Sequence, residues 1–88
     1  MNSAAYIPVS VIASFNTSGQ FIPLWFRYED CVYDVSAKLQ KEEYPFKYFD
    51  CRIEKCSDED NAKYTIGKEL TLIFHEKDFV WGISKNKY

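Results

Sequence analysis

The sequence predicts an all-β protein, a small antiparallel meander of six strands curled into an SH3-like barrel. Between residues 6 and 39, apolar residues recur at every second position through three segments that are separated by compact polar turns. A period of two places side chains on one face of a strand, whereas a helix needs apolar residues three and four positions apart. The composition is also rich in aromatic residues, at 18%, and strands favour these side chains. Closing the meander into a barrel would remove most free strand edges.

The first three strands follow from this alternation. The residues expected to point inward are Ile7, Val9, Val11, Ala13 and Phe15, then Ile22, Leu24, Phe26 and Tyr28, then Tyr33, Val35, Ala37 and Leu39. The connection at residues 16–20 contains Gly19, which adopts positive φ at no steric cost and suits a hairpin turn. Pro23 cannot donate a ladder hydrogen bond, so we expect an edge or a bulge there.

Residues 35–43 are open to a second interpretation. They include Ala37, Leu39 and Glu42, which are residue types with favourable helix propensity. A curved open sheet with one short helix at 35–43 is therefore the alternative fold. We favour a strand because the alternation of the preceding residues continues through this segment.

Three further strands complete the predicted barrel. Their inward residues are expected to be Phe49, Cys51 and Ile53, then Leu70, Leu72 and Phe74, then Phe79, Trp81 and Ile83. Residues 57–63 are the least apolar segment and predict a loop. We expect one domain spanning residues 1–88, because a chain of this length supports a single core. Residues 84–88 are expected to form a frayed tail.

A set of turn and core residues has a recognisable spacing. It reads Phe15-x-x-x-Gly19-x-x-x-Pro23-Leu24-x-Phe26, followed by Tyr33-x-Val35 and a late Trp81. This pattern resembles small bacterial β-barrel proteins of unknown function, some of which are carried on mobile elements. The resemblance implies the barrel fold and implies no activity.

The charge balance disfavours nucleic acid as a partner, and the lack of a long apolar segment disfavours a membrane. Eleven Lys and Arg stand against thirteen Asp and Glu, which gives a net charge of −2, and the basic stripe typical of nucleic-acid binders is missing. No run of apolar residues approaches the roughly 18 to 20 that would span a membrane, and the first residues lack the positive leader of a signal peptide. The three cysteines, an odd number, fit reduced thiols. We therefore expect a cytoplasmic protein.

The cysteines and the single histidine are the candidates for a zinc or catalytic site; Asp58, Asp60 and Glu69 match part of a calcium-loop pattern, but Lys63 stands where that loop needs glycine, so a solvated acidic loop is expected there. Cys31, Cys51, Cys56 and His75 could supply a zinc site by number. Strand alternation places Cys51 and Cys56 on opposite faces, and no Cys-x-x-Cys pair is present to seed a tetrahedral site. His75 is expected on the outer face of its strand, without the neighbours that general-base catalysis needs. We therefore predict no metal, no cofactor and no catalytic residue, and hence a protein that is not an enzyme.

Aromatic residues on the outer faces are the remaining candidates for function. The apolar residues expected to point outward are Tyr6, Ile12, Phe21, Trp25, Val32, Phe46 and Tyr48. From these we predict an interaction surface that consists of Trp25, Arg27, Phe46, Tyr48 and Arg52, because Trp, Tyr and Arg dominate binding hot spots. The predicted function is a non-enzymatic module that binds a protein partner or itself.

Two alternatives remain open at this point. The same aromatic residues could stack the bases of single-stranded nucleic acid, with Arg27 and Arg52 beside them, although the negative net charge opposes this. The outer aromatics could also form a second core layer beneath a helix or loop.

Overall fold

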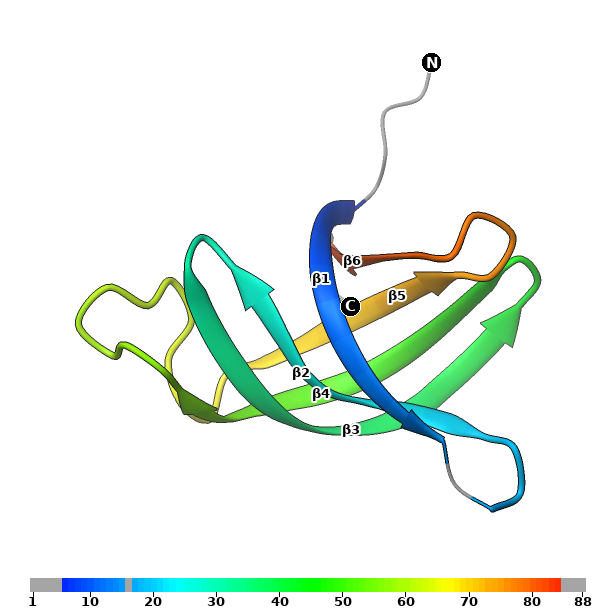
Figure 1. Cartoon of the computed structure of the whole chain (residues 1–88), viewed down its shortest axis with the longest axis horizontal. Coiled ribbons are helices and arrows are strands. Elements are labelled where there is room, and N and C mark those ends of the chain that lie inside the picture. Colours follow the sequence, from blue (N-terminus) through cyan, green and yellow to red (C-terminus); the bar gives the residue numbers. More distant parts are fainter. Residues whose placement is uncertain (1–5, 16, 85–88) are drawn as a thin grey trace.

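The computed structural model describes residues 6–15 and 17–84, and in them six strands form a closed barrel (Figure 1). The strands are β1 (Tyr6–Phe15), β2 (Phe21–Tyr28), β3 (Cys31–Glu43), β4 (Phe46–Cys56), β5 (Glu69–His75) and β6 (Val80–Ser84). Each strand pairs antiparallel with the next, and β6 returns to pair with β1. The prediction of a six-stranded antiparallel barrel is confirmed. The narrower SH3-like assignment stays a prediction.

Residues 35–43 belong to a strand, and the alternative of a helix there is wrong. β3 runs without interruption to Glu43, which pairs with Phe46 at the start of β4. Pairing with β4 at every residue of this segment except Gln40 outweighs its favourable helix propensities, which are a weak influence beside tertiary contacts. The far end of the chain also differs from expectation, because Ser84 is the last residue of β6. The rest of the expected frayed tail, residues 85–88, lies outside the described residues.

A bulge in β2 reverses the expected direction of its first side chains. Ile12 pairs with Trp25 and Ala13 pairs with Pro23, so Leu24 is left without a partner in β1. An edge or a bulge was predicted at Pro23, and the structure has a bulge there. Its consequence was not foreseen: Phe21 and the fully buried Pro23 point inward, whereas Ile22 and Leu24 are exposed. The predicted inward positions of Ile22 and Leu24, and the outward position of Phe21, are wrong because an extra residue shifts the alternation by one.

The core combines aromatic, aliphatic and cysteine side chains. Its buried members are Phe26, Cys31, Tyr33, Phe49, Cys51, Ile53, Leu72, Phe74 and Ile83. At one end of the barrel, the loop between β4 and β5 folds over this core and places the Tyr64 ring 5.5 Å from the Tyr33 ring. The Tyr33 hydroxyl accepts a hydrogen bond from the backbone N–H of Lys63 at 2.9 Å. Tyr33 therefore ties the loop to the core.

Tyr33→Phe tests this connection. We expect it to lower the free energy of unfolding by about 1 to 2 kcal/mol, because the partly buried N–H of Lys63 loses its acceptor. Chemical denaturation measures the loss, and the amide of Lys63 should exchange faster with solvent. Tyr48→Phe is the control, since Tyr48 lies on the outer face of β4 and contacts Phe46 and Lys41. Equal stabilities of the two variants would contradict this role of Tyr33.

Candidate interaction surface

The five residues predicted to form one interaction surface lie in three separate places. They are Trp25 with Arg27 on β2, Phe46 with Tyr48 at the start of β4, and Arg52 in the second half of β4. Trp25 pairs with Asp34, which pairs in turn with Lys55 on β4. Tyr48 lies earlier on the same strand than Lys55, and the usual rise per residue in a strand puts the two residues about 20 Å apart. The structure therefore does not bring the predicted aromatic residues together.

Trp25 has other apolar neighbours, on the outer side of β1 and β2. Ile12, directly opposite Trp25, is 47% exposed. Leu24, pushed outward by the bulge, is 45% exposed, and Ile22 is 36% exposed. We call these four residues, Ile12, Ile22, Leu24 and Trp25, the β1–β2 face. A group of exposed apolar side chains on neighbouring strands commonly marks an interaction site.

This part of the barrel also carries almost no charge. The ten residues of β1 include no charged side chain, and the eight of β2 include only Arg27. By contrast, the neighbouring β3 and β4 carry Asp34, Lys38, Lys41, Glu42, Glu43, Lys47, Asp50, Arg52, Glu54 and Lys55. Depletion of charge distinguishes the centres of protein interfaces from ordinary surface.

Phe46 and Tyr48 belong to a different cluster on the outer side of β4. Their ring centroids lie 6.2 Å apart, and the His75 ring of β5 packs edge-on to Phe46 at 4.9 Å. The Lys41 ammonium lies 4.8 Å from the centroid of the Tyr48 ring. Both aromatic side chains are only partly exposed, because neighbours from β3 and β5 pack against them. This cluster braces adjacent strands, and neither of its aromatic residues is as exposed as Ile12, Ile22 or Leu24.

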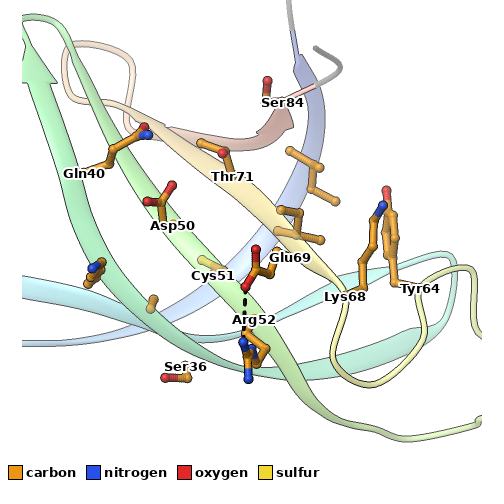
Figure 2. A pocket seen from close by; sticks show the side chains of 14 residues that line it. Ser36, Gln40, Asp50, Cys51, Arg52, Tyr64, Lys68, Glu69, Thr71 and Ser84 are labelled. Atoms are coloured by element: carbon orange, nitrogen blue, oxygen red, sulfur yellow. Dashed lines mark hydrogen bonds and ion pairs between the residues drawn. The ribbon is translucent and has the colours of Figure 1, made fainter. Parts of the chain in front are cut away.

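Arg52 lines a groove of about 910 Å³ that runs over β3, β4 and β5 (Figure 2). Its guanidinium forms an ion pair with Glu69 at 3.2 Å, and both side chains are exposed. Asp50 and Thr71 are cross-strand partners, and with Gln40 they line the same groove. Acidic and basic groups are therefore mixed here, and the groove lacks the positive field that a nucleic-acid backbone requires.

Cysteine and histidine positions differ in part from expectation. Cys56 packs against the core as Cys51 does, because a register shift between β3 and β4 places it opposite the buried Tyr33; the expectation of opposite faces is wrong. Burial raises the pKa of the Cys51 thiol to about 12, so this thiol stays protonated at neutral pH and is a poor nucleophile. His75 lies on the outer face, where its Nδ1 accepts a hydrogen bond from the N–H of Asp78 at 3.1 Å. Residues 6–15 and 17–84 hold no cluster of three side chains suited to a metal ion.

Comparison of the chain with protein-family models, with curated proteins and with solved structures gave no match. The described part of the chain contains no helix long and apolar enough to cross a membrane.

Two members of the β1–β2 face, Ile22 and Leu24, were expected in the core from strand alternation and so were not predicted to belong to an outer surface. The signal that could have revealed them was Pro23, since a bulge at that position reverses the direction of its neighbours.

Proposed function

We propose that this protein is a non-enzymatic interaction module that binds a protein partner, or a second copy of itself, through the β1–β2 face. One observation carries the proposal: three exposed aliphatic side chains lie beside Trp25 on two strands that hold a single charge. Removing apolar surface from water is worth roughly 25 cal/mol per Å², so covering this face with a partner is favourable. A reducing cytoplasm fits the three free thiols and is the proposed location.

The surroundings of the face support the same proposal. Ser10 pairs with Arg27 and Ser14 pairs with Ile22, so polar side chains border the apolar group along the outer side of the sheet. Asp34 borders it on the side of β3. An apolar centre inside a polar rim is the usual composition of a protein interface. In this proposal Trp25 is the central contact, because tryptophan is the most enriched residue among binding hot spots.

A photo-reactive amino acid at Leu24 tests the proposal in the cells that naturally make the protein. Leu24 is exposed and lies next to Trp25, so the reactive group would face a bound partner. The control is the same group at Glu59, an exposed residue of the loop between β4 and β5. We expect a discrete adduct from Leu24 and none from Glu59, and its mass distinguishes a foreign protein from a second copy. Absence of an adduct at Leu24, or equal adducts at both positions, would refute the proposal.

A further inference from the structure

The second half of β3 is a strand edge without a partner. β2 pairs with β3 only from Cys31 to Asp34, whereas β4 continues along β3 as far as Glu43. Beyond Asp34, the side of β3 that faces away from β4 meets no other strand within residues 6–15 and 17–84. Figure 1 shows this end of β3 diverging from the β1–β2 hairpin. Residues 38–43, which we call the β3 edge, are all exposed, and such an edge offers unpaired N–H and C=O groups to another strand.

We propose that the β3 edge pairs antiparallel with the β3 edge of a second copy, so that one continuous sheet joins two barrels. This surface is separate from the β1–β2 face, and the proposal does not depend on the function proposed above. A second copy is favoured over a foreign strand for two reasons. One is the direction of the side chains along the edge, and the other is the order of its charges.

The directions of the side chains select one register. The register between β3 and β4 shifts between Leu39 and Lys41, so Gln40 has no partner in β4, and two consecutive residues, Gln40 and Lys41, lie on the outer side. Lys38 and Glu43 lie on the same side: Lys38 pairs with Asp50 and Glu43 with Phe46, Gln40 lines the groove of Figure 2, and Lys41 covers the Tyr48 ring. On the inner side lie Leu39, which pairs with the buried Phe49, and Glu42, which pairs with Lys47. Paired residues of two antiparallel strands must point to the same face of the sheet. When two identical β3 edges run antiparallel, only the register that places Lys38 opposite Glu43 sets residues of the same face opposite each other at all six positions.

The same register brings opposite charges together. Each Lys38 faces Glu43 of the other copy, and the two-fold symmetry produces this pair twice. Lys38 forms no ion pair with any other residue that the structure describes. Glu43 lies 3.7 Å from Lys41 of its own strand, and both side chains are largely exposed, so this contact is weak and exchangeable. Opposite charges directly across a strand pair are stabilising, and like charges are destabilising.

The register also covers an apolar side chain. Leu39 points inward but remains 43% exposed, because no strand lies beside it on the free side of β3. In the proposed pair, Leu39 lies opposite Glu42 of the second copy, whose methylene groups would cover it. Glu42 keeps its carboxylate near Lys47 of its own chain, with which it forms an ion pair. Lys47 therefore already balances the charge of the Glu42 carboxylate when Glu42 approaches Leu39 of the other copy.

Charge-swap variants test the proposal by light scattering over a range of protein concentrations. We expect the measured mass of the wild type to rise with protein concentration from that of one chain, 10.4 kDa, to twice that value. Lys38→Glu and Glu43→Lys should each weaken the dimer by about tenfold or more, because each creates two like-charge contacts at the seam. The double variant, Lys38→Glu with Glu43→Lys, should restore the dimer. Glu59→Lys repeats the charge change of Glu43→Lys away from the edge and should leave the dimer intact.

Two further comparisons separate this proposal from the function of the β1–β2 face. Trp25→Ala should leave the edge-mediated dimer unchanged, and circular dichroism should show that every variant is folded. A wild type that stays monomeric at all concentrations would overturn the proposal. So would a double variant as weak as the single ones, or a dimer that Trp25→Ala abolishes, since that dimer would belong to the β1–β2 face.

Discussion

Phe21→Ala is expected to lower the free energy of unfolding by about 3 kcal/mol, at the lower end of the range for truncating a core phenylalanine. The inward-pointing ring of Phe21 lies 5.1 Å from the ring of Phe74, 5.3 Å from that of Phe15 and 5.8 Å from that of Phe49. Truncation would remove these contacts together and leave a cavity in the aromatic end of the core. Thermal unfolding should show a decrease in Tm of roughly 12 °C or more for a domain of this size.

Ile22→Ala is the matched control, because Ile22 is the next residue along β2 and points to solvent. We expect it to change the free energy of unfolding by about 0.5 kcal/mol or less, as exposed positions usually do. Simple alternation of the sequence predicts the opposite order, with Ile22 in the core. Equal effects, or a larger effect at Ile22, would contradict the bulge and the inward position of Phe21.

Gly82→Ala is expected to lower the free energy of unfolding by about 2 kcal/mol, within the usual range for overpacking. Gly82 pairs with Pro8 of β1 and with Ile73 of β5, and the side chain of Tyr6 lies across it. A Cβ at position 82 would lie 2.1 Å from Cδ1, 2.7 Å from Cγ and 2.9 Å from Cβ of Tyr6. Because Cβ is the least movable of these atoms, the whole Tyr6 side chain or the backbone of β1 would have to shift.

A double-mutant cycle with Tyr6→Ala separates the clash with Tyr6 from any effect that replacing Gly82 has without that clash. In the Tyr6→Ala background, Gly82→Ala should cost at least about 1 kcal/mol less than in the wild type, since residues in contact are energetically coupled. Chemical denaturation of the four proteins provides the comparison. Strictly additive effects would show that the Tyr6 side chain does not lie against Gly82.

Much of the fold could be predicted from the sequence because strand alternation is a local property. The inward positions of Phe26, Tyr33 and Phe49 followed directly from it, and all three are buried. Prediction failed at strand ends, where Phe15 and Phe79 were expected to point inward but are 73% and 79% exposed. It also failed where an added residue changed the count. The bulge at Leu24 reversed the first half of β2, and a register shift between β3 and β4 placed Cys56 against the core. Of these two irregularities, only the bulge in β2 had a signal in the sequence, namely Pro23 with its missing N–H.

The interaction surface was less predictable, because it depends on how strands are placed beside one another. Trp25 and Tyr48 were expected to be neighbours, but whether two outward residues meet is decided by strand register and strand length. The long β3–β4 hairpin places Tyr48 far along β4 from Lys55, the residue that lies in register with Trp25. The actual neighbours of Trp25 include Leu24, which only the bulge brings to the outer side. The absence of charge along β1 was a signal in the sequence that could have indicated this region, but it was not used.

The most direct test of the β1–β2 face is the yield of the Leu24 adduct in a Trp25→Ala background, with circular dichroism to confirm that the variant is folded. If Trp25 is the central contact, its truncation should reduce the adduct by tenfold or more, since loss of a hot spot costs about 2 kcal/mol or more of binding free energy. Tyr48→Ala, on the outer side of β4 away from this face, should leave the yield unchanged. A folded Trp25→Ala protein with an undiminished adduct would contradict the proposed role of this face.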